Sequence, residues 1–373
     1  MKVLYVITED WFFHSHFLDR AKHVLNSGGT VGVATRFSVH EADLERLGFE
    51  LFPLNFSRRG LNPIAEFITS LKIRKIIREF KPDIAHNVAL KPVVTGTFGA
   101  LLGRQSVVVN ALVGMGYIFT STDTRASMIK PFLSRILKFL LHSKSVHVVI
   151  ENPDDFNSLV KDGFVNETQI SLIRGAGVDL NAFQFHPEGA GPIVVTMVSR
   201  ILRDKGVLEF IDAASQLRTR IPDVMFQIVG EPDTGNPSAI SLSEINSWEF
   251  LPNVRYLGRR TDIASILKES HIVCLPSYRE GLPKSLLEAL SSGRPIITTD
   301  VPGCREVCDD GVNGLLVPPR DSIALANAIE KLSTNSQLRQ QMGIAGRKRA
   351  ETEFSNEIVC TQTLDLYRKL STK

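Results

Sequence analysis

The sequence predicts an α/β protein built from two doubly wound parallel sheets. Three observations predict this class. Short β-rich runs alternate with helical patterns along the whole chain, which is the order that parallel sheets with crossover helices require. The 373 residues are enough for two domains of ordinary size. The segment 186–192, HPEGAGP, has no periodicity and is typical of a linker.

The first half contains five expected strands. The first is followed at once by the polar residues Thr8, Glu9 and Asp10, so it is too short for a signal peptide or a membrane-spanning helix and reads as a buried strand. The expected strands are Lys2–Ile7, Thr30–Ala34, Asp83–His86, Ser106–Asn110 and Val146–Ile150, and the expected helices are His14–Asn26, Asn62–Phe80 and Pro92–Leu102.

The second half repeats this alternation after the linker. Its expected strands are Ile193–Val198, Val224–Val229, Val254–Leu257, His271–Leu275 and Pro295–Thr299, and its expected helices are Val207–Leu217, Ile263–Lys268, Lys284–Ser291 and Ser322–Leu332. We therefore expect domains at 1–185 and 193–350, and a C-terminal helix at 351–373 that could return to the first domain. Ligands of such sheets bind outside the carboxyl ends of the strands, so two facing domains would form a central cleft.

Composition excludes several classes of protein. The formal net charge of +3 argues against a protein that coats polyanions. Four cysteines are too few for a disulfide framework, and Cys304 and Cys308 lack the spacing of a zinc site, so we expect a reducing cytoplasmic compartment. No run reaches about 18 uncharged apolar residues, which argues against a transmembrane helix.

Residues 128–145 predict an amphipathic helix with two possible roles. The surrounding window, 56–145, holds 14 basic residues against four acidic ones. Such a basic, amphipathic segment can lie on anionic lipid headgroups, and it can equally be a core helix with a solvated basic side. The residues expected at a membrane surface are Lys130, Phe132, Leu133, Arg135, Leu137 and Lys138.

The phosphate-binding motifs of dinucleotide enzymes and P-loop proteins are missing. The first strand is followed by Thr8-Glu9-Asp10-Trp11 instead of G-x-G-x-x-G, and no G-x-x-x-x-G-K-[ST] occurs. A hydride-transfer enzyme is therefore not expected.

The densest chemical signal lies at 275–293. A strand end leads through Glu280 and Gly281 into a helix with Pro283 at its first position. The amide groups and dipole at the start of that helix can hold a phosphate. Glu288 follows eight residues after Glu280, which corresponds to about 12 Å along a helix. Two carboxylates at this distance could contact the two ends of a folded nucleotide diphosphate. That separation is too large for the pair of carboxylates, about 5 Å apart, of a retaining glycosidase.

Two cations are expected at the same edge of the sheet. Arg200 and Lys205 follow the first strand of the second domain and could stabilise the charge that develops on a departing diphosphate. Each residue alone is typical of a surface ion pair, and the combination is what indicates a site. Because the chain has no D-x-D motif, we expect metal-independent chemistry with no cofactor.

With these motifs the chain resembles the retaining family 4 glycosyltransferases of the GT-B fold, in which two Rossmann-like domains face a central cleft. The resemblance rests on E-G-x-x-x-x-x-x-E at 280–288 and S-R-x-x-x-D-K-G at 199–206. The blocks 10–16, 86–92, 110–117 and 299–306 are similar to the branch that builds undecaprenyl-linked surface glycans. Within it, the chain is most similar to bacillosaminyl-diphospho-undecaprenol N-acetylgalactosaminyltransferases.

The resemblance implies roles for individual residues. Glu280 would contact the sugar hydroxyls of a UDP-sugar such as UDP-GalNAc, and Glu288 the ribose. The backbone from Gly281 through Leu282 to Pro283 would hold the distal phosphate, and Arg200 and Lys205 the diphosphate. Arg259 falls where relatives bind the base. Retention would proceed by front-face displacement, at the cytoplasmic face of the inner membrane, onto an undecaprenyl-diphosphate-linked saccharide.

The first domain departs from the family pattern. Glu9-Asp10-Trp11 replaces a Gly-Gly phosphate loop, and Asn110-Ala111-Leu112 stands where many relatives have a histidine. The residues expected to line the acceptor side are Asp10, His14, His16, His86 and Lys91. Two alternatives stay open: a non-hydrolysing UDP-GlcNAc epimerase and a non-catalytic module that binds a nucleotide sugar.

Overall fold

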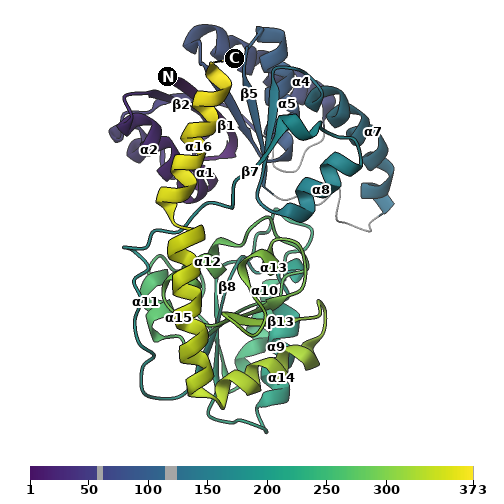
Figure 1. Ribbon diagram of the computed structural model, residues 1–373. Helices are drawn as coiled ribbons and strands as arrows, with labels where there is room; N and C mark the ends of the chain where they lie inside the picture. Colours follow the sequence, from purple (N-terminus) through teal and green to yellow (C-terminus); the bar gives the residue numbers. More distant parts are fainter. Residues whose placement is uncertain (57–61, 114–123, 373) are drawn as a thin grey trace. The chain divides into compact units, whose positions relative to one another are not determined.

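The computed structural model describes residues 1–56, 62–113 and 124–372, and for residues 124–129 and 249 it describes the backbone alone (Figure 1). The chain divides into two compact units. Unit 1 contains Met1–Ala176 and Asn356–Lys373, and unit 2 contains Gly177–Ser355.

The described residues of unit 1 form a parallel sheet of seven strands in the order β3-β2-β1-β4-β5-β6-β7. All five expected strands are present; the edge strands β3 and β7 were not predicted, because they are short and only partly buried. The strands are β1 (Lys2–Glu9), β2 (Thr30–Arg36), β3 (Glu50–Pro53), β4 (Ile84–Val88), β5 (Val108–Leu112), β6 (Val146–Ile150) and β7 (Ile170–Leu172).

Helices cover both faces of this sheet (Figure 1). A hydrophobic cluster lies beneath each helical layer. The expected helix at 14–26 is two helices, α1 and α2, separated at Phe17. The helices are α1 (Asp10–His16), α2 (Leu18–Asn26), α3 (Glu41–Arg46), α4 (Pro63–Phe80), α5 (Leu90–Gly103), α7 (Thr124–Leu141), α8 (Pro153–Lys161) and α16 (Asn356–Ser371), with a 3₁₀ turn, η1, at Glu167–Gln169.

Local signals explain where the long helix α4 starts and stops. The side chain of Asn62 accepts a hydrogen bond from the amide of Ile64 at 3.0 Å, and Pro63 occupies the first helical position. Lys81 then adopts a left-handed conformation ahead of Pro82, which ends the helix.

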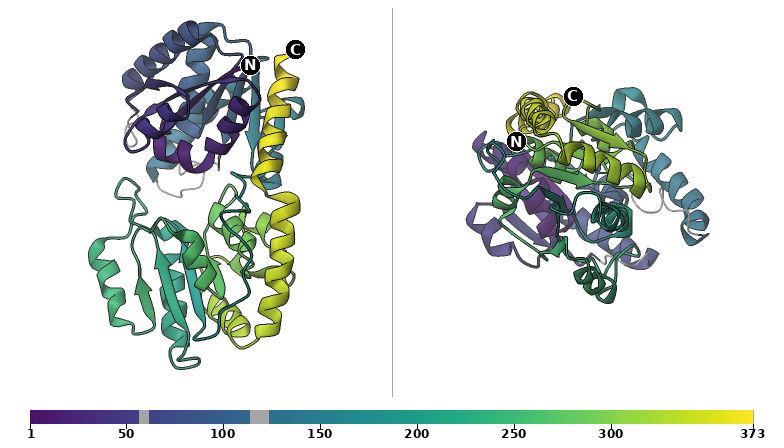
Figure 2. Two further views of the ribbon diagram at one scale, coloured as in Figure 1. Left: turned by 90° about the vertical axis from the view of Figure 1, so that its left-hand side faces the viewer. Right: turned by 90° about the horizontal axis from the view of Figure 1, so that it is seen from below.

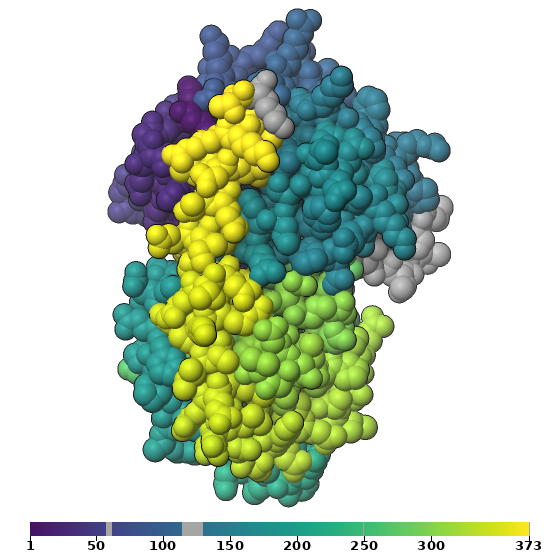
Figure 3. Space-filling model, viewed as in Figure 1, coloured from purple at the N-terminus to yellow at the C-terminus, as the bar shows by residue number. Residues whose placement is uncertain are grey.

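The C-terminal helix α16, yellow in Figure 2 and Figure 3, packs against α2 in unit 1. Val359, Leu364 and Tyr367 belong to the same buried cluster as Tyr5. The hydroxyl of Tyr367 lies 3.0 Å from that of Tyr5 and also hydrogen-bonds Nδ1 of His86. Burial lowers the pKa of His86 to about 3, so this imidazole is neutral at ordinary pH.

We expect the substitution Tyr367→Phe to lower the free energy of unfolding by about 1–3 kcal/mol, because it leaves buried polar groups of Tyr5 and His86 without their partner. Urea unfolding measures the change, and Arg368→Ala, at an exposed position of the same helix, is the control. Equal stability of Tyr367→Phe and wild type would contradict a stabilising role for this hydroxyl.

Unit 2 is built on a parallel sheet of six strands in the order β10-β9-β8-β11-β12-β13, over one hydrophobic cluster. The strands are β8 (Val194–Val198), β9 (Met225–Val229), β10 (Val254–Tyr256), β11 (Ile272–Leu275), β12 (Ile296–Thr299) and β13 (Gly314–Val317). The helices are α9 (Val207–Leu217), α10 (Leu242–Ser247), α11 (Ile263–Glu269), α12 (Lys284–Ser291), α13 (Cys304–Val307), α14 (Ser322–Ser333) and α15 (Ser336–Glu353), with 3₁₀ turns η2 (Arg203–Lys205) and η3 (Trp248–Phe250). The predicted bounds of α9 and α12 are confirmed.

The boundary between the units lies at Ala176–Gly177, before the expected linker at 186–192. Residues 178–188 already belong to unit 2: Leu180 and Phe183 pack on its core, and the Ser291 hydroxyl donates to the Phe183 carbonyl at 2.6 Å. The proline and glycine content of 186–192 indicates irregular backbone, but these packing contacts decide the boundary. The second crossing, at Ser355–Asn356, separates α15 from α16.

Candidate functional site

The loops at the carboxyl ends of β8, β9, β11 and β12 are bonded to one another in unit 2. The amide of Ile201 donates to the carbonyl of Glu231 at 3.0 Å. The amide of Tyr278 donates to the carbonyl of Asp204 at 2.9 Å, and that of Glu280 to Pro302 at 3.2 Å. Because parallel strands end at one edge of the sheet, these bonds join the loops into one surface at the place where such sheets bind ligands.

Lys205 and Glu280, predicted from separate motifs, are in contact on this surface. The ammonium group of Lys205 forms an ion pair with Oε1 of Glu280. Their side chains are 19% and 12% exposed. Ser277, which sequence reasoning missed, donates its hydroxyl to the same carboxylate oxygen at 2.6 Å. A cation and a carboxylate are thus held side by side at the edge of the sheet, both reachable from solvent.

Glycines allow the backbone segments of this site to approach one another. Gly206, at φ +74°, follows Lys205, and a Cβ there would overlap the carbonyl oxygen of Pro276. A Cβ at Gly303, which has φ +80°, would likewise overlap the carbonyl oxygens of Glu280 and Gly281. Both positions combine a left-handed backbone with a close approach, so any side chain would push the two loops apart.

The other predicted cations at this edge have acidic partners that sequence reasoning missed. Arg200 donates to Asp233 at 2.8 Å, and Arg259 lies 3.5 Å from Glu231. Both acids come from Glu231-Pro232-Asp233, the loop after β9. Two acidic residues directly after a strand and a glycine were the sequence signal that could have identified these partners. The structure therefore places Arg200 and Arg259 at the edge, each paired to this loop.

The helix α12 begins next to the ion pair. Gly281, Leu282 and Pro283 lead into it, and Leu282 and Pro283 are buried. Glu288 lies one turn after Lys284, with the ammonium and carboxylate groups 3.7 Å apart. Burial raises the pKa of Glu288 to about 7, although Lys284 lowers it in part. Glu288 therefore changes charge close to neutral pH.

This arrangement is suited to a phosphorylated ligand. The start of α12 offers backbone amides and the positive end of a helix dipole, and Lys205 adds a full positive charge nearby. Glu280 and Glu288 are acceptors for hydroxyl groups. Within the described part of the chain, no group of three or more metal-ligating side chains is present.

In unit 1, Asp10 and His86 do not line a surface, which corrects the expectation that they form the acceptor side. Asp10 is 0% exposed and accepts hydrogen bonds from the Ser38 hydroxyl at 2.6 Å and from the amides of Ser38, Val39 and His40 at 2.8 Å each. Burial alone would raise the pKa of Asp10, but these bonds hold it well below its usual range. His86 is 1% exposed and stacks on Tyr5. Asp10 thus anchors the loop after β2, and His86 anchors α16.

Each of the remaining acceptor candidates contacts a different residue. His14 stacks on His40, with ring centroids 4.0 Å apart. His16 bonds Ser15, and the Lys91 ammonium lies 2.7 Å from the carboxylate of Glu66 on α4. All three are partly exposed. Of the block 110–117, residues 114–117 lie outside the described residues. Asn110, in the same block, is buried and accepts a hydrogen bond from the side-chain amide of Asn87 at 2.9 Å.

The helix α7 has a core face and a separate exposed face. Leu137 is buried and Leu133 packs on the core, which corrects their assignment to a membrane surface. Phe132 and Phe139 are 70% and 75% exposed. The exposed basic residues beside them are Lys130, Arg135 and Lys138, of which Lys138 also donates to the carbonyl of Asp162 at 2.6 Å. None of the described helices is long and apolar enough to span a bilayer.

Two family models match the chain, one in each half. Residues 2–155 match the model described as glycosyl transferase 4-like, and residues 179–349 match the model of glycosyl transferases group 1. The first match covers most of unit 1, and the second contains every donor-side candidate named above.

Curated relatives and solved structures extend these matches over most of the chain. The N,N'-diacetylbacillosaminyl-diphospho-undecaprenol alpha-1,3-N-acetylgalactosaminyltransferase of Campylobacter jejuni is 28% identical, over 88% of each chain. The UDP-Gal:alpha-D-GlcNAc-diphosphoundecaprenol alpha-1,3-galactosyltransferase of Escherichia coli is 26% identical, over 75% of this chain and 74% of the relative. The crystal structure of Anabaena HepE in complex with UDP superposes with a TM-score of 0.80 at 20% identity, over 99% of this chain and all of that one.

Proposed function

Because this chain is a group 1 glycosyltransferase with the GT-B fold, we propose that it is a retaining family 4 enzyme. It transfers an N-acetylhexosamine, such as GalNAc, from a UDP-sugar to an undecaprenyl-diphosphate-linked saccharide. The observation that carries this proposal is the contact between Lys205 and Glu280 at the start of α12. A cation for a diphosphate and a carboxylate for sugar hydroxyls stand side by side at a ligand-binding edge.

The donor sugar nucleotide occupies the carboxyl edge of unit 2. Lys205 and Arg200 contact the diphosphate, and Glu280 accepts hydrogen bonds from the sugar hydroxyls. The backbone of Gly281 to Pro283 holds the distal phosphate. Glu288 accepts from the ribose hydroxyls, and the segment at Arg259 contacts the base. The ion pairs of Lys205 and Arg200 keep both cations in position before the donor binds, which lowers the ordering cost of binding.

The transfer proceeds on one face of the sugar. The acceptor hydroxyl oxygen forms a bond to the anomeric carbon while the bond from that carbon to the phosphate oxygen breaks. UDP leaves with the electron pair, and its phosphate oxygen takes the proton of the acceptor hydroxyl. Lys205 and Arg200 stabilise the charge that develops on the leaving diphosphate, and the proposed reaction needs no metal ion.

The acceptor class is proposed from the relatives. The names of the Campylobacter and Escherichia coli relatives contain an undecaprenol diphosphate carrying a first sugar. An enzyme acting on such a lipid serves surface-glycan or glycoprotein-glycan assembly and works at the cytoplasmic face of the inner membrane. Partly exposed residues of unit 1, His14, His16 and Lys91, are the remaining candidates for the acceptor side.

Mass spectrometry of the lipid product tests the proposal. The purified protein is incubated with an undecaprenyl-diphosphate-linked saccharide and a panel of UDP- and GDP-sugars. We expect the lipid to gain the mass of one N-acetylhexosamine residue from one UDP-sugar. A parallel reaction without acceptor identifies an epimerase, which would convert the donor alone. Tight UDP binding without transfer to any acceptor would indicate a binding module.

We expect the affinity for UDP to rise with pH because the deprotonated form of Glu288 is the better acceptor for ribose hydroxyls. With a pKa of about 7, the carboxylate fraction, and with it the contribution of Glu288 to binding, increases by about tenfold between about pH 6 and pH 8. Calorimetry of UDP binding across this range measures it. The Glu288→Gln variant retains only the titration of UDP itself, so identical pH profiles for both proteins would contradict the role of Glu288.

We propose that unit 1 contacts the membrane through exposed apolar and basic residues of α7 and α4. The exposed Phe132 and Phe139 lie seven residues apart on α7, which places them on one face with Arg135 between them. On α4, a second exposed apolar stripe consists of Ile64, Phe67, Ile68 and Leu71, followed by the exposed basic residues Lys72, Lys75 and Arg78. Apolar side chains next to cations are what an anionic lipid surface binds.

We expect the double substitution Phe132→Ser and Phe139→Ser to release the protein from vesicles that contain anionic lipid. Each phenylalanine loses roughly 1.5–3 kcal/mol of burial energy if it is fully buried in the interface. Vesicle sedimentation measures the bound fraction. Phe250→Ser, at an exposed position of unit 2, is the matched control. Retention of the α7 variant at wild-type levels would show that α7 is not in the contact.

A further inference from the structure

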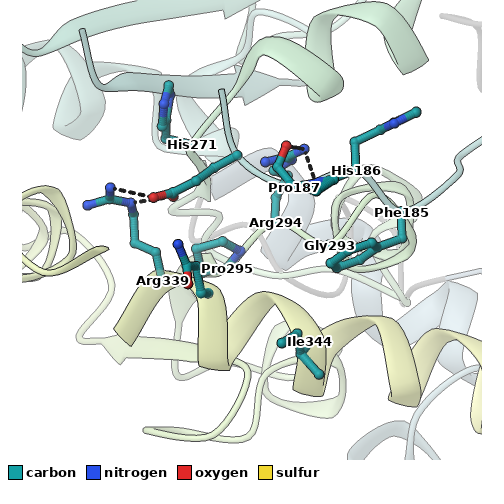
Figure 4. A pocket seen from close by; sticks show the side chains of 11 residues that line it. Phe185, His186, Pro187, His271, Gly293, Arg294, Pro295, Arg339 and Ile344 are labelled. Atoms are coloured by element: carbon teal, nitrogen blue, oxygen red, sulfur yellow. Dashed lines mark hydrogen bonds and ion pairs between the residues drawn. The ribbon is translucent and has the colours of Figure 1, made fainter. Parts of the chain in front are cut away.

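A cavity lies at the amino edge of the unit 2 sheet, opposite the carboxyl-edge loops. Its volume is about 270 Å³. His271 immediately precedes β11 and Pro295 immediately precedes β12, so both mark the amino ends of the strands. Figure 4 shows the lining residues converging from these strand starts, the segment 185–188 and α15.

The cavity contains two buried guanidinium groups and one carboxylate. Arg339, on α15, forms a paired contact with Glu188, at 2.9 Å and 3.0 Å (Figure 4). Arg294 is 1% exposed and donates through Nη2 to the carbonyl oxygen of His186 at 2.7 Å and, more distantly, to that of Pro187 at 3.5 Å. Its Nε is buried and has no hydrogen-bond partner among the described residues. Both carboxylate oxygens of Glu188 therefore bond Arg339, while the charge of Glu188 also attracts Arg294.

His271 adds no charge to this cavity. Its Nδ1 accepts from the amide of Val194 at 3.2 Å, so the proton lies on Nε2, which donates to the carbonyl of Gly189 at 3.1 Å. The imidazole is therefore neutral in this arrangement. Two guanidinium groups and one carboxylate leave the site with an excess of one positive charge.

A buried charge that lacks its counter-charge is strongly unfavourable. Burial lowers the pKa of Arg294, and the attraction of Glu188 offsets this only in part. Guanidinium groups do not lose their proton in proteins, so Arg294 stays charged, and a bound anion would supply the missing negative charge. Oxyanions match the fork of N–H donors that a guanidinium presents.

We propose that this cavity binds a small oxyanion, a phosphoryl or carboxylate group, through Arg294. The volume is near the lower end of the range, roughly 300–1,000 Å³, of small-molecule sites, which admits the anion with a small organic body. Arg294, Arg339 and His271 are buried at its base, and the exposed Phe185, Gln340 and Ile344 are on its rim. An anion bound there would connect the segment 185–188 to the start of β12.

The proposed anion site is separate from the donor site. The strand β11 separates His271 from Pro276 by five residue steps, about 16 Å at strand spacing. Ligand bound at one edge therefore does not touch residues at the other. Failure of the anion proposal would leave the proposed glycosyltransferase site unaffected.

Thermal unfolding in inorganic phosphate, at constant ionic strength and with saturating UDP to occupy the donor site, tests the proposal. We expect a saturable rise in melting temperature for the wild type and for Arg220→Met, whose arginine forms an exposed ion pair with Glu330 elsewhere in unit 2. Arg294→Met should weaken the apparent phosphate affinity at least fivefold. Glu188→Gln should strengthen it, because the competing carboxylate charge is removed.

Arg294→Met and Glu188→Gln are expected to change the phosphate affinity in opposite directions. This difference distinguishes a binding role of Arg294 from a purely structural one. If Arg294 only fastens the segment 186–187, both Arg294→Met and Glu188→Gln lower the melting temperature equally with and without phosphate, and the proposal is overturned. Absence of any phosphate effect on the wild type and on Glu188→Gln also overturns it. Replacing phosphate by acetate identifies the group: equal stabilisation indicates a carboxylate, and weaker stabilisation a phosphoryl group.

Discussion

Substitution of Lys205 by alanine is expected to lower kcat/KM for sugar transfer by about 10²–10³-fold, the usual effect of removing one group that stabilises developing negative charge. In the proposed reaction the substitution removes one of the two cations, Lys205 and Arg200, that contact the leaving diphosphate. Lys205 is held by Glu280, so it is in position before the donor arrives. Steady-state kinetics with the donor and the lipid-linked acceptor measure the loss.

Arg203→Ala is the matched control for this experiment. Arg203 lies on the same 3₁₀ turn as Lys205 but forms its ion pair with Glu244, at 2.7 Å. We expect the control to keep activity within a few-fold of wild type. Turnover by Lys205→Ala equal to that of Arg203→Ala would contradict the assignment of Lys205 to the diphosphate.

Gly206→Ala is expected to have the largest effect on stability, with a loss of about 2 kcal/mol or more. The substitution forces a left-handed backbone on alanine and sets its Cβ against the carbonyl oxygen of Pro276. The 199–206 and 276–283 loops must then move apart, which also separates Lys205 from Glu280. We expect lower stability in urea together with weaker UDP binding.

Gly258→Ala separates the two causes. Gly258 has φ +63° but open space around its Cβ position, so alanine there carries the backbone strain without the collision. We expect a loss of about 1 kcal/mol. Equal losses for the two variants would indicate that the contact between the loops contributes nothing.

Hydrophobic periodicity was enough to predict most strands of the two sheets and, apart from α15, the long helices among the described residues. The bounds of α9 and α12 agree with the structure because each begins or ends at a clear signal, such as Pro283 before α12 and Gly293 after it. Runs of three or four residues are at the limit of what a pattern can resolve: among the edge strands, β10 was predicted, whereas β3, β7 and β13 were not.

Long-range packing explains what the sequence could not predict about the sites. The contact between Lys205 and Glu280 joins residues 75 positions apart, although each motif was visible by itself. Asp10 and His86 looked like surface residues because they follow or end strands. Their burial depends on the loop 38–40 and on α16, both distant in sequence. Polar residues at strand ends can anchor the fold as well as bind ligands.

The division of α7 into two faces shows the same limit. Periodicity identified an amphipathic helix, but it could not tell which apolar residues face the sheet. Leu137 is in the core, whereas Phe132 and Phe139 are exposed. The vesicle experiment is therefore designed on Phe132, which the pattern selected, and Phe139, and it leaves out Leu133 and Leu137.

Hydrogen exchange with and without UDP tests the central claim most directly, because it reports where the nucleotide binds. We predict that saturating UDP slows amide exchange in residues 199–206 and 276–288 of the wild type, and that Lys205→Ala weakens this protection while Arg203→Ala does not. Protection confined to unit 1, or protection of 199–206 and 276–288 that is the same in Lys205→Ala as in the wild type, would contradict a donor site built on Lys205 and Glu280.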